Sequence, residues 1–306
     1  MKYFIITVDT EGDNLWNYRK GQTIKTENSL YIPRFQDLCE AYGFKPVWLT
    51  NYEMAKDKRF VDYIRPKMEA GLCEIGIHIH AWNTPPLHEL NAKYSGNPYL
   101  IEYPDKIMHE KFETTFNLLK YNFNINVKSH RAGRWVMDNR YFSLLNEYDI
   151  KADCSCTPGV SWADTAGETT MGTNYSKVSI KPHIVNGVLE IPMTIKKTHS
   201  SKRGSFKHRL RTLFQGENIW LRPATATVEE MLWLCSKVDK DINVDYLEFM
   251  IHSSELMPGG SPYFKDDCAI ENLYMKIEKV FEYVQDLGYE GITMIDYCNN
   301  FKDKGR

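Results

Sequence analysis

The order of strand-like and helix-like segments is the feature that most limits what this chain can fold into. Short apolar runs alternate with longer amphipathic runs, several of which end at a glycine. Repeated strand-then-helix units favour a parallel sheet covered by helices. The predicted strands are 3–8, 46–50, 73–79, 125–129, 150–153, 188–192, 247–251 and 292–295, and the predicted helices are 28–42, 58–70, 105–121, 138–147, 227–238 and 269–287.

The number of these units indicates an α/β barrel, since roughly seven of them fill the chain. An apolar content of 42% and a charged content of 25% are typical of a globular protein. We expect one barrel domain over residues 1–306. Three stretches rich in polar residues or proline, 83–104, 157–187 and 196–223, are expected to be insertions or short β-excursions.

Charge and cysteine content exclude several classes of protein. The net charge is −2, so the chain as a whole has no field that attracts nucleic acid or a membrane. No apolar run is long enough to span a bilayer, and acidic residues follow the first apolar stretch where a signal peptide would be cleaved. Seven cysteines are an odd number for a disulfide framework, and Cys154 and Cys156 lack the spacing of a zinc ribbon. We therefore expect reduced thiols in a cytoplasmic protein.

Polar side chains stand at or just after the ends of most predicted strands. The carboxyl ends of parallel strands meet at one rim of a barrel, so we expect these side chains to face a common mouth. A single polar residue at a strand end is ordinary, because strand ends meet solvent. The residues are Asp9, Glu11, Thr50, Asn51, His78, His80, His130, Arg131, Asp153, His252 and Asp296.

Two pairs among them have the spacing of metal ligands. His78 and His80 are two residues apart, so in a strand both imidazoles project to the same side and can reach one cation. Asp9 and Glu11 have the same spacing, which would let one carboxylate bind the ion while the other acts as a base. Acids and imidazoles together suit zinc or another first-row divalent metal with an open position for a water.

Asp9 and Glu11 lie in a segment that resembles a family motif. TVDTEG, residues 7–12, is similar to the T-F-D-D-G motif of the polysaccharide deacetylase family, carbohydrate esterase family 4. Asp9 matches the catalytic-base aspartate of that family, and Thr10 stands where a metal-binding aspartate is usual. The resemblance to members with a D-x-E arrangement gives the metal role to Glu11.

The second and third motifs of the family are also matched in part. EIGIH, residues 74–78, matches E-I-G-x-H, but the second histidine of the motif would fall on Trp82, so His80 is the expected substitute. The third motif, R-x-P-x-G, resembles the segment that begins at Arg131 and lacks the proline. Asp153 resembles an aspartate on the fifth strand of many relatives, and His252 follows an apolar strand as in the last motif.

This resemblance implies a distorted (β/α)7 barrel that hydrolyses N- or O-acetyl groups of sugars with a divalent metal, here most simply zinc. The implied metal ligands are Glu11, His78 and His80. The implied catalytic residues are Asp9 as base, Arg131 as the group that orients it, and His252 as acid. The substrate would be an acylated sugar, nucleotide sugar or polysaccharide, as for deacetylase-like proteins of surface-polysaccharide assembly, with Trp82, Trp135 and Asp153 in contact with it.

The sequence also allows two other functions, and it does not assign a role to one basic segment. An amidohydrolase barrel also carries an H-x-H pair, but on its first strand rather than its third. A catalytically degenerate sugar-binding barrel would explain the departures from the motifs, and metal content separates it from an enzyme. The basic run 196–211 contains no acid and would suit an acidic polysaccharide or a diphosphate, or is a solvated insertion.

Overall fold

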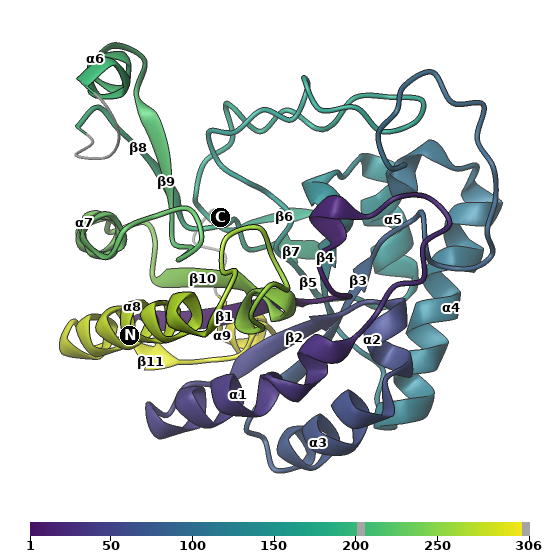
Figure 1. Ribbon diagram of the computed structural model, residues 1–306, viewed down its shortest axis with the longest axis horizontal. Helices are drawn as coiled ribbons and strands as arrows, with labels where there is room; N and C mark the ends of the chain where they lie inside the picture. Colours follow the sequence, from purple (N-terminus) through teal and green to yellow (C-terminus); the bar gives the residue numbers. More distant parts are fainter. Residues whose placement is uncertain (201–205, 302–306) are drawn as a thin grey trace.

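A curled, mainly parallel sheet forms the centre of the computed structural model, which describes residues 1–200 and 206–301 (Figure 1). The strand order is β10-β1-β2-β3-β4-β5-β7-β6, and β11 also pairs with β1. All neighbours from β10 to β7 are parallel, and β6 runs antiparallel to β7. The strands are β1 Tyr3–Thr10, β2 Pro46–Thr50, β3 Glu74–Ile79, β4 Ser129–Ala132, β5 Ala152–Asp153, β6 His183–Val185, β7 Val188–Glu190, β10 Tyr246–His252 and β11 Glu290–Gly291.

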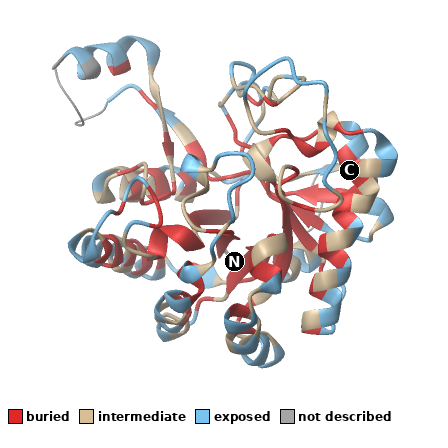
Figure 2. Cartoon of the chain, turned by 45° about the vertical axis from the view of Figure 1, so that its right-hand side comes forward, coloured by how far each residue is buried: buried red, intermediate tan, exposed pale blue. Residues whose placement is uncertain are grey.

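Helices cover the outer face of the curled sheet, so the strands lie in the core (Figure 2). Several helices begin at a side chain that accepts a backbone N–H, which fixes where the chain turns helical. The α-helices of the barrel are α1 Ile32–Ala41, α2 Tyr52–Lys56, α3 Lys58–Glu69, α4 Asp105–Phe123, α5 Asn139–Glu147, α7 Val228–Asp239, α8 Asp267–Asp286 and α9 Met294–Asn300. Shorter turns are η1 Leu15–Asn17, η2 Glu27–Leu30, η3 Leu100–Glu102, η4 Gly133–Trp135 and η5 Ser253–Leu256.

In the described residues, β10 at one end of the sheet is joined by single bonds rather than by a ladder to the chain on either side of a hairpin. The backbone N–H of Glu248 on β10 donates to Thr194 Oγ1 at 2.8 Å, and that of Met250 donates to the Leu221 carbonyl at 3.1 Å. Residues 194 and 221 flank a hairpin of β8 Ile195–Thr198 and β9 Glu217–Trp220, which carries α6 Phe206–Gln215 at its tip. In Figure 1 this arm projects away from the sheet. The barrel is therefore distorted at the seam from which the arm rises.

The expected α/β class and parallel sheet are confirmed, and two of the predicted strands differ from the observed ones. The fourth strand is Ser129–Ala132 instead of 125–129. The last segment is mainly helical, because the Thr293 side chain accepts the N–H of Asp296 and starts α9, leaving only Glu290–Gly291 as a strand. All seven cysteines are free. Among the described helices, none has the length and apolar character required to cross a bilayer.

Candidate metal and catalytic site

Strand register brings the predicted residues together at one end of the sheet. β1 and β10 pair so that Asp9 lies beside His252, and β3 and β4 pair so that His78 lies beside Arg131. Glu11 directly follows β1. Each position is at or just past the carboxyl end of a parallel strand, so residues from distant parts of the sequence meet over one mouth.

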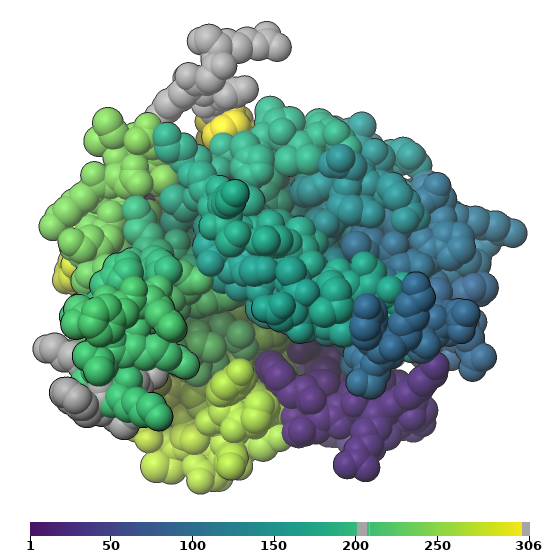
Figure 3. All heavy atoms as spheres, turned by 90° about the horizontal axis from the view of Figure 1, so that it is seen from above, coloured from purple at the N-terminus to yellow at the C-terminus, as the bar shows by residue number. Residues whose placement is uncertain are grey.

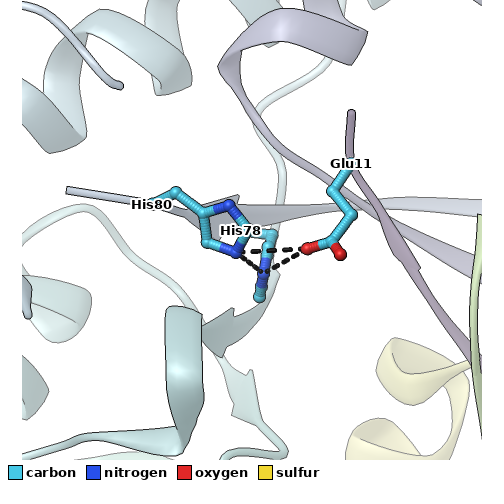
Figure 4. A group of neighbouring side chains, drawn as sticks. All are labelled: Glu11, His78 and His80. Atoms are coloured by element: carbon cyan, nitrogen blue, oxygen red, sulfur yellow. Dashed lines mark hydrogen bonds and ion pairs between the residues drawn. The ribbon is translucent and has the colours of Figure 1, made fainter. Parts of the chain in front are cut away.

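Glu11, His78 and His80 form a triangle of ligand atoms (Figure 4). The Nε2 atoms of His78 and His80 are 3.0 Å apart, and Oε2 of Glu11 lies 3.8 Å from the first and 3.2 Å from the second. A tetrahedral ion with bonds of about 2.0–2.1 Å holds neighbouring ligand atoms roughly 3.3 Å apart. The three atoms therefore have the separation that one divalent cation requires.

The surroundings of the two imidazoles direct both Nε2 atoms into this triangle. His78 Nδ1 lies 2.8 Å from the backbone carbonyl of Arg131, to which it donates, so its Nε2 presents a lone pair. The His80 ring stacks on Trp82 with centroids 4.2 Å apart and an angle of 17°. Two imidazole nitrogens held this close repel each other unless a proton or a cation lies between them. The donor set therefore fits a metal ion.

Burial sets the charge of the three ligands before a cation binds. It lowers the pKa of His78 and of His80 to about 4, so both rings are neutral at neutral pH. It raises the pKa of Glu11 to about 7, although the charges of His252 and His78 oppose this shift. Two neutral imidazoles and a carboxyl close to its midpoint can bind a cation at neutral pH with the release of only about half a proton.

Asp9 is held in a different state by a buried guanidinium. Burial alone would raise the pKa of Asp9, but Arg131 and the nearby imidazoles lower it to about 2. Arg131 Nη1 lies 2.5 Å from Asp9 Oδ1, and its Nη2 contacts Thr7 Oγ1 at 2.8 Å and the Glu248 carboxylate. Asp9 is therefore an ionised carboxylate at neutral pH, fixed by Arg131 beside the ligand triangle.

His252 faces the same acids from the other side. Its Nε2 lies 3.7 Å from Asp9 Oδ2 and 3.9 Å from Glu11 Oε1. Arg222 Nη2 lies 3.1 Å from its Nδ1 and 2.6 Å from Glu255 Oε1. Burial lowers the pKa of His252 and Arg222 lowers it further, but Glu11 and Glu255 raise it above its usual value in sum. The imidazole can therefore carry a proton at a position where it meets the cavity.

Aromatic side chains form much of the wall of a cavity of about 570 Å³ above these groups. The predicted contacts Trp82 and Trp135 both line it. Arg134 and Trp135 have φ of 58° and 65°, an uncommon conformation for residues other than glycine, and both side chains reach the cavity. The other aromatic residues of the lining are Trp16, Tyr18, Trp162 and Tyr263. Figure 3 shows this face, where the N-terminal segment, the segment 157–187 and the segment after β10 meet.

Three residues expected at the rim lie elsewhere. Asp153 is fully buried within β5, where its Oδ1 lies 2.5 Å from His130 Nδ1 and accepts from Ser155 Oγ at 2.8 Å. His130 packs between α4 and α5, because neighbours along β4 point to opposite faces and only Arg131 points inward. Asp296 lines a cavity with Glu74 at the amino ends of the strands. The structure therefore does not bring Asp153 to the cavity, and its expected contact with substrate lacks support.

Sequence reasoning did not find several residues of the cavity. Arg222 and Tyr263 come from segments without strand or helix periodicity, and Trp16 lies in the short turn η1. Glu255 follows His252 by three residues and accepts its backbone N–H at 3.1 Å. That spacing of a carboxylate after the first residue of a turn was the only signal in the sequence for this group.

Comparisons with known proteins show the fold of the chain but not its activity. No protein-family model matches the sequence, and a search of curated proteins finds no match. The GH57-type branching enzyme from Pyrococcus horikoshii is similar in structure, with a TM-score of 0.55 and 10% identity over 99% of this chain and 71% of that one. The family 4 acetyl xylan esterase from Clostridium thermocellum has a TM-score of 0.49 and 11% identity, covering 98% and 91% of the two chains. A putative polysaccharide deacetylase from Mycobacterium smegmatis has a TM-score of 0.48 and 14% identity, covering 95% and 93%.

Solved structures of the carbohydrate esterase family 4 are thus among those that the comparison finds. At identities this low the likeness concerns the fold alone. The activity has to be argued from the geometry of the site.

Proposed function

We propose that the protein is a metal-dependent hydrolase that removes an acyl group, most simply acetyl, from a sugar or a polysaccharide precursor. The observation that carries the proposal is the triangle of Glu11, His78 and His80 beside an ionised aspartate and a histidine on one wall of the cavity. The aromatic lining supports a sugar substrate, because indole and phenol rings stack on the apolar faces of sugars.

The chain contributes ligands, a base and an acid to the proposed reaction. A divalent ion held by Glu11, His78 and His80 would activate a water and polarise the acyl carbonyl. Asp9, kept ionised by Arg131, takes the proton of the attacking water. Protonated His252 gives a proton from Nε2 to the leaving amine or alcohol, while Glu255, whose Oε1 lies 3.5 Å from Nδ1 and 2.6 Å from Arg222 Nη2, holds the ring in place.

Zinc is the metal we propose, since two imidazoles and one carboxylate form a known catalytic donor set for that ion. Thr10, which stands where the related motif has a metal-binding aspartate, donates instead to the Val8 carbonyl within β1 at 3.0 Å. Glu11 reaches the triangle from the next position, so the D-x-E arrangement supplies the acid that Thr10 cannot.

The test is metal content together with acyl release. The purified full chain should contain about one divalent ion per molecule and release acetate from acetylated sugars. His78→Ala together with His80→Ala should lose both properties and keep its circular dichroism spectrum. His109→Ala, which removes a half-exposed histidine on α4, is the matched control and should behave as the wild type. Retention of a full equivalent of metal by the double variant would refute the ligand assignment.

The alternatives make different predictions in the same experiment. In an amidohydrolase barrel the H-x-H pair ends the first strand, whereas here it lies at the end of β3 and the acids lie at the end of β1. A degenerate sugar-binding barrel would not bind metal, and added metal would not stabilise it. Stoichiometric metal without acyl release from any sugar would instead point to a different hydrolytic substrate.

A further inference from the structure

The helix at the tip of the arm exposes a group of large apolar side chains. Leu210, Leu213 and Phe214 of α6 are 46%, 58% and 75% exposed. With 3.6 residues per turn, these positions share one face of the helix. Thr212, which is 2% exposed, lies on the opposite face toward the hairpin. Figure 2 shows the helix coloured mainly as exposed, away from the rest of the molecule.

Cations flank this apolar face. Arg209 lies on one side of it, and Lys207 and Arg211 lie on the other, all three exposed. The segment 196–211 has seven lysines and arginines and no acid, although the whole chain has a net charge of −2. Residues 201–205 of this basic segment lie outside the described residues, and Lys196 pairs with Asp241 at 3.3 Å.

The combination of apolar and basic side chains on α6 limits which kinds of partner could bind this helix. A nucleotide or an acidic polysaccharide would use the cations and leave the leucines and Phe214 in water. A second copy of this chain would bring two basic segments together, which like-charge repulsion opposes. A helix with an apolar face bordered by lysine and arginine fits the boundary between the headgroups and acyl chains of an anionic bilayer.

We propose that α6 docks the protein on the surface of a membrane that contains anionic lipids. The apolar face would enter the interface while Lys207, Arg209 and Arg211 contact lipid phosphates. The base of the arm is tied to the cavity wall, because Trp220 of β9 packs against Trp135 and Trp162 with ring centroids 5.8 Å and 6.4 Å apart. Docking would therefore hold the mouth of the cavity close to the lipid surface.

The experiment is co-sedimentation of the full chain with vesicles of phosphatidylcholine alone or mixed with phosphatidylglycerol, at low and high salt. We expect binding to the mixed vesicles that weakens as salt rises. Replacing Leu210, Leu213 and Phe214 together by serine should weaken binding by about tenfold or more. Arg209→Gln with Arg211→Gln should weaken it by about thirtyfold at low salt, since each cation near an anionic surface contributes roughly fivefold.

The matched control is Tyr121→Ser with Ile242→Ser, which removes apolar side chains that are 82% and 93% exposed elsewhere. This variant should bind vesicles as the wild type does. Circular dichroism and metal content should be unchanged in all three variants. The proposal fails if the wild type ignores phosphatidylglycerol, or if both α6 variants bind as well as the wild type. It also fails if the serine variant loses self-association in light scattering instead of vesicle binding, because α6 would then be an interface between copies.

Discussion

At the scale of single residues, the two carboxylates near the end of β1 differ because their neighbours differ. Asp9 contacts Arg131 directly, which keeps its pKa near 2. Glu11 lies within 3.9 Å of the imidazoles of His78, His80 and His252, and burial nevertheless raises its pKa to about 7. One acid is thereby always ionised, and the other is suited to exchange its proton for a cation.

Exchange of these two side chains for their amides should separate the roles. Asp9→Asn removes the base while keeping the shape, so turnover should fall by about a hundredfold or more with the metal retained. Glu11→Gln should lose the metal. Metal analysis and initial rates of acyl release measure the two effects. If Asp9→Asn loses the metal and Glu11→Gln retains it, the two roles are reversed.

Metal affinity should depend on pH in a way that identifies Glu11. With a pKa of about 7, its carboxyl is protonated below neutrality, and a cation has to displace that proton. Affinity should therefore fall about tenfold per pH unit below 7 and more steeply near 4, where the imidazoles protonate as well. Titration calorimetry in buffers of different ionisation enthalpy counts the protons released. An affinity that is flat between pH 5 and 7 would contradict the pKa of Glu11.

The buried carboxylate of Glu53 lies near His80 and should hold its ring in position. Nδ1 of His80 and Oε2 of Glu53 are both buried and have no hydrogen-bond partner among the described residues. The Oε1 of Glu53 accepts from Asn51 at 2.6 Å and from Asn83 at 2.8 Å, so the carboxylate is fixed near the ring. A metal-bound histidine usually donates its other N–H to such a group.

Glu53→Gln should therefore weaken metal binding by about tenfold to a hundredfold without removing a ligand. The reason is that the amide is a poorer partner for the His80 N–H than a carboxylate. Competition with a chromophoric chelator measures the affinity. Glu89→Gln is the control, because Glu89 is exposed and lines the same surface cavity as Glu53. If the two variants bind the metal with equal affinity, Glu53 does not position His80.

At the scale of elements, the short turn η5 after β10 holds the proposed acid. Glu255 within η5 accepts the backbone N–H of His252 and an Nη2–H of Arg222. Both partners are largely buried, so each charge depends on the other. The turn thus couples the position of His252 to an ion pair that joins η5 to the end of β9.

Low pH should break the ion pair between Glu255 and Arg222, because it protonates Glu255. Burial would raise the pKa of Glu255, but Arg222 and His252 lower it to about 2. A carboxyl with a lowered pKa stabilises the fold above its ordinary value of 4.5, and this contribution is lost as the pH falls from there toward 2. Glu255→Gln should cost about 3 kcal/mol at pH 7, because Arg222 is left buried without its partner, and should flatten the loss of stability in this acid range. Urea unfolding at several pH values measures both effects, and an unchanged acid slope would contradict the assignment.

At the scale of the whole molecule, the sequence predicts the parts of the site that follow from local spacing. The i, i+2 pairs Asp9 with Glu11 and His78 with His80 could be recognised because a strand turns both members to one side. Asp153 does end the fifth strand as predicted, but it pairs with His130 on β4, and the alternation of side chains turns both toward the helices rather than the cavity. The end of a strand can be located in the sequence without showing which face its last side chain takes.

Other parts of the molecule depend on contacts that no local pattern records. The pair of Arg222 and Glu255 exists because the end of β9 meets η5. The open seam of the sheet and the arm that rises from it also follow from tertiary packing, and no local pattern predicted the hairpin of β8 and β9 with α6 at its tip. The net charge of the whole chain is likewise close to zero, although the segment 196–211 is strongly basic.

The arm should behave as an addition to the barrel that is anchored only at its base. Thr198 and Glu217 are cross-strand partners, so residues 199–216 can be replaced by Asn-Gly, a two-residue turn suited to a hairpin. This change should alter the free energy of unfolding by less than about 1 kcal/mol, because the apolar face of α6 contacts solvent rather than the core. Trp220→Ala, which removes the packing against Trp135 and Trp162, should cost about 2 kcal/mol or more. Urea unfolding compares the two, with metal content as the check on the site. If the shortened arm costs as much as Trp220→Ala, the tip packs on the barrel, and α6 is not free to meet a membrane.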